Sequence, residues 1–252
     1  RFNYPSLCFD NFYNNPDRVR DYALSLEGWT NIHGAHPGLR TAMLIEYDEG
    51  FYRKSVDKFM ALFDDWMPAG ASFDCSTYFQ KVYRFSSDPN DVVNNGWIHV
   101  DGEVDIAGVI YLDPDPILDN GTSFYRPNGT SCYQQNSDNF IFNDVLKENP
   151  LQYQRVLGSP KSTAVDKNIC KVDDMEWYRE NLIKNNEQFE LTMEVKNCYN
   201  RCIAYSGQQI HTVTNFWSPN EDDFRLAQVF FVYDLRLPPN FITSCRVHDY
   251  DI

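Results

Sequence analysis

The chain has 252 residues, of which 42% are hydrophobic and 15% aromatic, and its formal net charge is -14. A chain of this length and composition can bury one sizeable core, which excludes a disordered protein. Its negative field repels phosphate backbones and anionic lipid surfaces, so we expect neither nucleic acid nor a membrane as a partner. One domain covering residues 1–252 is therefore the starting expectation.

Seven cysteines are scattered along the chain without a Cys-x-x-Cys pair. This number and spacing do not suit a disulfide framework or a structural zinc site, and they indicate reduced thiols in a cytosol. The sequence has neither a signal-peptide pattern nor an apolar stretch long enough to span a bilayer. We therefore expect a cytoplasmic protein.

Residues 1–70 are predicted to form supporting helices. An apolar, aromatic run over residues 5–13 favours a short strand or an extended segment. Asn15 and Pro16 then supply a cap and a first-turn proline, and apolar residues follow at helical spacing. Apolar steps of three and four over residues 52–66 indicate a second, amphipathic helix.

Residues 32–40 contain two glycines and a proline and are predicted to form a loop. The loop carries His33 and His36, which could be a pair of metal ligands. We favour histidines that face solvent, because no nearby carboxylate completes a metal set.

Strand signals begin at residue 73. Alternating apolar residues over 73–85 predict a long strand, and shorter strands are expected over 106–112 and 122–126. Together, residues 73–126 are assigned to a β core.

Residues 127–188 interrupt this pattern and are interpreted as a helical insertion. Its last helix follows the cap Asp173-Asp174, and strand signals return over residues 190–235. Strands on both sides of an insertion, with helices at the N-terminus, predict an α+β, mainly β protein. Its core is expected to be a double-stranded β-helix, which is a jelly-roll or cupin-like sandwich.

His99 and Asp101 are the first candidates for chemistry. Residues i and i+2 of a strand point to the same side, so both can face one point, and Gly102 lets the chain turn away. His211, which opens a later strand after a turn, is the best candidate for a third ligand. Two histidines and one carboxylate leave positions open on a metal, as in non-haem Fe(II) oxygenases, although zinc fits the same ligands.

Arg225 separates these two interpretations. It lies inside an apolar strand, where an unpaired charge is costly. An oxygenase needs a cation to hold the far end of a chelating co-substrate, whereas a zinc hydrolase needs only water at the metal. An internal ion pair with an acid such as Asp234 is the alternative for this arginine.

The order of these residues, together with two strand motifs between them, carries a resemblance to a known family. The motifs are Gly108-Val-Ile-Tyr-Leu and Gly121-Thr-Ser-Phe-Tyr. With His99-x-Asp101, His211 and Arg225 they resemble the 2-oxoglutarate- and Fe(II)-dependent dioxygenases of the prolyl-4-hydroxylase-like group. The resemblance covers roughly residues 73–234.

The resemblance implies that the two histidines and Asp101 hold iron. It implies that Arg225 forms a bidentate salt bridge to the distal carboxylate of 2-oxoglutarate, that Tyr111 hydrogen-bonds the same carboxylate, and that Tyr83 lines the co-substrate pocket. The implied reaction uses O2, releases succinate and CO2, and hydroxylates a substrate. The acidic turn over residues 218–223 departs from compact members of the group, as does the long gap before His211, and both leave the substrate unassigned.

The substrate cleft is expected between residues 32–40 and 127–188, since loops around a rigid barrel mouth usually supply specificity. Their asparagines, glutamines, tyrosines and acids favour a polar substrate, such as a peptide side chain or a small amino-acid-like molecule. Two alternatives stay open. One is a non-catalytic cupin-like module that binds a metal or a sugar, and the other is a zinc hydrolase on the same ligands.

Overall fold

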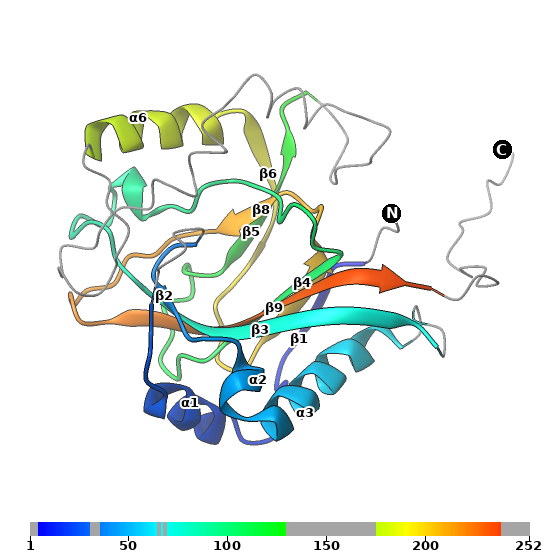
Figure 1. Ribbon diagram of the computed structural model, residues 1–252. Helices are drawn as coiled ribbons and strands as arrows, with labels where there is room; N and C mark the ends of the chain where they lie inside the picture. The colour runs from blue at the N-terminus through cyan, green and yellow to red at the C-terminus, as the bar shows by residue number, and fades with distance from the viewer. Residues whose placement is uncertain (1–4, 31–35, 65–66, 68–69, 130–174, 238–252) are drawn as a thin grey trace, which may run out of the picture.

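A computed structural model describes residues 5–30, 36–64, 67, 70–129 and 175–237. The strands are antiparallel and form two sheets, with the N-terminal helices packed beneath the larger sheet (Figure 1). In chain order the elements are β1 (Leu7–Phe9), α1 (Pro16–Ser25), β2 (Leu39–Arg40), α2 (Leu44–Tyr47), α3 (Glu49–Met60), β3 (Ser72–Tyr83), β4 (Ile106–Tyr111), β5 (Thr122–Pro127), α6 (Met175–Asn186), β6 (Phe189–Val195), β7 (Cys202–Ser206), β8 (His211–Val213) and β9 (Phe224–Arg236).

The two sheets face each other as a jelly roll. The larger sheet has the strand order β1-β7-β4-β9-β3-β2, and the smaller has the order β6-β5-β8. From β4 onward the chain changes sheet at each step except from β5 to β6, and buried side chains such as Ala107 and Tyr205 meet Phe124 between the sheets. The predicted α+β, mainly β class with a double-stranded β-helix core is confirmed.

Strand β9 runs through the centre of the larger sheet and separates two environments. Its side chains alternate, so Leu226 and Phe230 face the helices while Arg225 and Val229 face the smaller sheet. On the helix side, the ring of Phe59 stacks on that of Phe230 with centroids 4.5 Å apart. The N-terminal helices thus cover the outer face of the larger sheet, and the inner face is left for a pocket.

The predicted helices and strands agree with most of these elements. Asn15 caps α1 by accepting the Arg18 N–H at 3.1 Å, and the last helix of the predicted insertion is α6. A loop was predicted for residues 32–40. Its last two residues are wrong, because Leu39–Arg40 form the edge strand β2, which pairs with β3. The helices expected earlier in the insertion fall outside the described residues. Within the described ranges, no helix is both long and apolar enough to cross a membrane.

The stacked rings of Phe59 and Phe230 mark a position where a substitution should strongly destabilise the fold. Phe59 is fully buried, and removing its ring leaves a cavity that the rigid sheet cannot fill. We expect Phe59→Ala to lower the free energy of unfolding by about 3–5 kcal/mol, measured by urea denaturation with circular dichroism. Phe9→Ala is the control, because Phe9 is 41% exposed. Equal losses in the two variants would contradict this packing.

Candidate functional site

His99 and His211 lie directly opposite each other on neighbouring segments. The His99 N–H donates to the His211 carbonyl at 3.0 Å, and the His211 N–H donates to the His99 carbonyl at 2.9 Å. Residues paired in this way project their side chains from the same face of a sheet. The two imidazoles therefore lie side by side, with ring centroids 4.4 Å apart.

Asp101 completes the group because it follows His99 by two residues. Its N–H donates to the Gly207 carbonyl at 2.9 Å, which ties it to the turn before β8. Gly102 then turns the chain away with φ of 64°, a left-handed conformation that glycine adopts at little cost. The two Asp101 carboxylate oxygens lie 3.4 Å from His99 Nε2 and 3.4 Å from His211 Nε2.

Backbone carbonyls orient both imidazoles. His99 Nδ1 lies 2.7 Å from the Trp97 carbonyl, and His211 Nδ1 lies 2.8 Å from the Gln209 carbonyl. A carbonyl oxygen can only accept a hydrogen bond, so Nδ1 of each ring carries the proton in these contacts. The Nε2 atom of each ring then keeps its lone pair, on the side where Asp101 lies. Metal-bound histidines usually make this kind of second contact, which fixes the tautomer and the ring.

The three side chains form a site that could hold one metal ion. Their ligand atoms all lie within 4.8 Å of one another. In the part of the chain that the structure describes, no other group of three such residues comes this close. Two imidazole nitrogens and one carboxylate suit Fe(II) or Zn(II) and leave the other side of the metal open.

Helix α6 holds the segment that leads into His99. Asn186 accepts the Ile98 N–H at 3.1 Å and donates to the Gly96 carbonyl at 3.0 Å, while Asn185 donates to the Ile98 carbonyl at 3.2 Å. Both asparagines were missed by the sequence analysis, because side chains that bond to a distant backbone leave no periodic signal. Through these two side chains, the end of the predicted insertion contacts the segment that carries His99.

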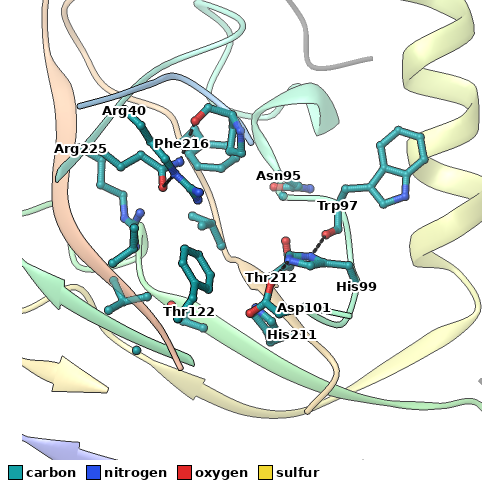
Figure 2. A pocket seen from close by; sticks show the side chains of 18 of the residues that line it. Arg40, Asn95, Trp97, His99, Asp101, Thr122, His211, Thr212, Phe216 and Arg225 are labelled. Carbon is teal, nitrogen blue, oxygen red and sulfur yellow. Dashed lines mark hydrogen bonds and ion pairs between the residues drawn. The ribbon is translucent and has the colours of Figure 1, made fainter. Parts of the chain in front are cut away.

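A pocket with an empty volume of about 850 Å³, part of it open to solvent, contains the three metal-ligand candidates and Arg225. Figure 2 shows Arg225 on the wall across from His99, Asp101 and His211. Tyr178 of α6 and Phe231 of β9 also line the pocket. The metal-ligand candidates and the candidate anchor for the co-substrate thus share one space.

Arg225 is buried there with an incomplete set of partners. Only 7% of the residue is exposed; its Nε donates to the Asn120 carbonyl at 2.9 Å, and its Nη2 has no hydrogen-bond partner. The alternative ion pair with Asp234 does not form, since Asp234 lies near the other end of β9. A buried cation with an unused N–H donor is costly unless an anion binds it.

The two predicted tyrosines differ in where they lie. The Tyr111 hydroxyl is 2.8 Å from Thr122 Oγ1, and Arg225 Cζ is 5.1 Å from the centre of the Tyr111 ring. Tyr83 instead packs against Phe224, with ring centroids 5.5 Å apart. Alternation along β3 turns Tyr83 to the face opposite the pocket, so its predicted contact with the co-substrate is wrong.

Asp113 is a charged neighbour of Arg225 that the sequence analysis missed. Its carboxylate accepts the Leu226 N–H, at 3.1 Å from one oxygen and 3.2 Å from the other. Burial raises the pKa of Asp113 to about 6, although the Leu226 N–H and the Arg225 charge act in the opposite direction. The folded protein therefore binds this proton more tightly than the unfolded chain does.

This pKa predicts how stability depends on pH. Because the folded pKa exceeds the ordinary value, the stabilisation from the Asp113 proton is full at low pH and disappears as pH rises through about 6. Asp113→Asn keeps an acceptor for Leu226 and removes the titration. We expect the variant to gain about 1–2 kcal/mol over wild type between pH 4.5 and pH 8, measured by urea unfolding. A constant difference over this range, or an equal gain in Asp57→Asn on the exposed face of α3, would contradict it.

Comparisons with known proteins identify the fold. No known family's sequence profile matches the chain, and no curated protein does. HygX from Streptomyces hygroscopicus with nickel and 2-oxoglutarate bound is similar, with a TM-score of 0.51 and 14% identity over 94% of this chain and 84% of that one. The iron-bound form of HygX gives a TM-score of 0.50 with the same identity and coverage. At this identity the likeness establishes a shared jelly-roll fold.

A prolyl hydroxylase from Trichoplax adhaerens also aligns, in a complex with a peptide fragment of a hypoxia inducible factor. Its TM-score is 0.43 at 12% identity, over 91% of this chain and 83% of that one. A score this low does not place the chain in the prolyl-4-hydroxylase-like group. That finer assignment stays a prediction.

The metal site itself can be tested without a substrate. We expect His99→Ala and His211→Ala each to weaken Co(II) binding by more than about 100-fold, since loss of a ligand exceeds the cost of losing its supporting hydrogen bond. Isothermal titration calorimetry measures this affinity. His36→Ala is the matched control, because His36 lies outside the group of three. Unchanged affinity in either of the first two variants would disprove the ligand assignment.

Proposed function

We propose that this protein is an Fe(II)- and 2-oxoglutarate-dependent oxygenase. In this proposal His99, Asp101 and His211 hold the iron, and Arg225 binds the co-substrate. The observation that carries it is the buried Arg225 guanidinium, whose Nη2 has no hydrogen-bond partner, in the same pocket as the three ligands. Without Arg225, the three candidate ligands would suit zinc as well as iron.

2-Oxoglutarate fits both parts of this pocket. It is a dianion whose keto oxygen and nearer carboxylate can chelate a metal, while its distal carboxylate extends away. A guanidinium fork matches a carboxylate in shape and charge, and such a pair would satisfy the unused Nη2 donor. The Tyr111 ring lies against the same guanidinium, and its hydroxyl pairs with that of Thr122, so one of the two hydroxyls keeps a hydrogen to donate. HygX, which has the same fold, binds 2-oxoglutarate in its crystal structure.

The bound iron and co-substrate would supply the oxidising chemistry, in which O2 converts 2-oxoglutarate to succinate and CO2 and places one oxygen atom in a substrate C–H bond. The protein's own residues would position and enclose the reactants. Val229, Phe231 and Phe216 would provide apolar walls around the reactants. The hydrogen-bonded imidazoles keep the ligand geometry fixed, so little rearrangement is needed when the metal binds.

Binding of the co-substrate gives the sharpest test. Fe(II) and 2-oxoglutarate, mixed with the protein without oxygen, should give a weak visible charge-transfer band. We expect His211→Ala to abolish the band. Arg225→Gln should retain iron but weaken 2-oxoglutarate binding by about 10- to 100-fold, the loss of a hydrogen-bonded charge pair. Arg53→Gln, on the exposed surface of α3, is the control for removing an arginine.

Two results would count against the proposal. A folded, iron-loaded protein that gives no band with 2-oxoglutarate would exclude it. Zinc retained through purification, with hydrolytic activity that needs no oxygen, would favour a zinc hydrolase on the same three ligands.

A further inference from the structure

A second pocket adjoins the first at Arg225. It has an empty volume of about 1230 Å³, part of it open to solvent, and Arg225 and Phe216 line both pockets. Figure 2 shows these two side chains in the first pocket. The other walls of the second pocket come from Arg20 of α1, from the loop after β4 and from the acidic turn before β9. None of the three candidate metal ligands lines it, so it is a separate site.

Buried polar atoms without partners are concentrated in the wall of this second pocket. In the described residues, five buried side-chain nitrogen or oxygen atoms have no hydrogen-bond partner, and three of them belong to residues that line it. One is Nη2 of Arg225, the anchor proposed for the co-substrate. The other two are the Arg20 Nε atom, which is a donor, and the Asn197 Oδ1 atom, which is an acceptor. Leaving such atoms unpaired is costly, so a ligand that pairs with them is stabilised.

The unpaired donor and the unpaired acceptor are neighbours of one carboxylate. The Asn197 side chain hydrogen-bonds the Asp113 carboxylate, and the Arg20 charge acts on the same group. Asp113 is itself fixed, because it accepts the Leu226 N–H of β9 at 3.1 Å. The parts of a binding site are therefore already in place around Asp113.

The orientation of the Asn197 amide is set by this contact. Asn197 is 1% exposed, and its backbone N–H donates to the Leu118 carbonyl at 2.9 Å. A carboxylate only accepts, so the amide must turn its NH2 group to Asp113 and its Oδ1 away from it. Turning the amide round would place two acceptors against each other. A donor from outside the chain is therefore the way to satisfy Oδ1.

The charges of the pocket exclude a strongly charged occupant. Side chains of both signs line it, namely Arg20, Arg225, Asp113, Asp115, Asp222 and Asp223. An anion would meet like charges at the acids, and a cation would meet them at the two guanidinium groups. The only group of three close metal-ligating side chains in the described residues lies in the first pocket. A neutral molecule with both donors and acceptors fits this wall best.

Apolar rings make up much of the remaining wall. Three prolines and two phenylalanines contribute to it, namely Pro114, Pro116, Pro219, Phe216 and Phe224. Ligand pockets commonly combine apolar walls with a few fixed polar groups. A hydroxyl group both donates and accepts, so several hydroxyls on one compact carbon framework match this combination.

We propose that the second pocket binds a neutral sugar. One of its hydroxyls accepts from Arg20 Nε, another donates to Asn197 Oδ1, and the C–H faces of its ring pack against the prolines and phenylalanines. The site goes beyond the proposed function, because it uses neither the metal nor 2-oxoglutarate. The contact with Arg20 is a hydrogen bond at Nε, so a positive charge at residue 20 is not sufficient.

Saturation-transfer NMR tests this proposal on the full chain without metal or co-substrate. The probes are D-glucose, D-galactose, D-mannose and N-acetyl-D-glucosamine. D-Glucuronate, D-glucosamine and glycine serve as the anionic, cationic and zwitterionic comparisons. We expect at least one neutral sugar to receive saturation and to bind more tightly than all three comparisons.

Variants assign the binding to Arg20. Arg20→Met should weaken binding of the responding sugar by about tenfold, the loss of one hydrogen bond from a charged donor. Arg20→Lys keeps the charge but removes the Nε donor, so we expect a similar loss. Arg18→Met is the matched control, because Arg18 is exposed on the same helix. Affinity for Co(II) should stay within about threefold of wild type in all three variants, which shows that the metal pocket is intact.

Any of four results would overturn the proposal. These are that no neutral sugar binds, that glucuronate, glucosamine or glycine binds as tightly as the sugars, that Arg20→Met binds the sugar like wild type, or that Arg20→Lys restores full binding. The first would leave water as the occupant of the pocket, and the last would mean that charge alone is recognised. Failure of the proposed function is a separate outcome, since the sugar titration contains neither iron nor 2-oxoglutarate.

Discussion

The site depends on the pair of backbone hydrogen bonds between His99 and His211. These bonds join two segments that are far apart in the sequence and make them extend the smaller sheet. Both imidazoles are then oriented by the carbonyls of residues two positions earlier in the chain, and Asp101 is tied to the turn before β8. The entropic cost of ordering the three candidate ligand side chains is therefore met when the chain folds. Binding of a metal would then cost little further conformational entropy.

Strand β9 joins this site to the stability of the whole protein. One face of the strand carries Arg225 into the pocket, and the other carries Phe230 onto Phe59 of α3. The packing on the helix side holds the backbone of β9 in place, and therefore the point from which the Arg225 side chain extends into the pocket. Asp113, which follows β4, accepts the backbone N–H of Leu226 in β9, so the carboxylate beside Arg225 is held by the strand that carries the arginine. Stability and anion binding are thus coupled through a single element.

The sequence predicted the fold class because strands and helices differ in the period of their apolar residues. It also brought His99, Asp101, His211 and Arg225 into one hypothesis, and the structure places them around one pocket. Other features depend on information that a single sequence does not contain. A two-residue strand such as β2 has no period, and its pairing depends on the absence of a side chain at Gly38.

The error at Tyr83 has a different physical origin. The prediction that this residue belongs to a long strand is correct, but the choice between the two faces of β3 depends on register against β9. A shift by one residue reverses every side chain. The pKa of Asp113 was equally out of reach, because it follows from burial beside a residue more than a hundred positions away.

The place of residue 40 on an edge strand sets it apart from the candidate metal ligands. The candidate metal ligands are joined by paired backbone bonds within the sheets, so exchanging any one of them damages the shared centre. Residue 40 lies at the last strand of the larger sheet, next to β3 alone among the strands. A substitution at residue 40 therefore disturbs fewer strand pairings than one at His211, so this edge of the sheet can vary in sequence while the paired histidines keep their places.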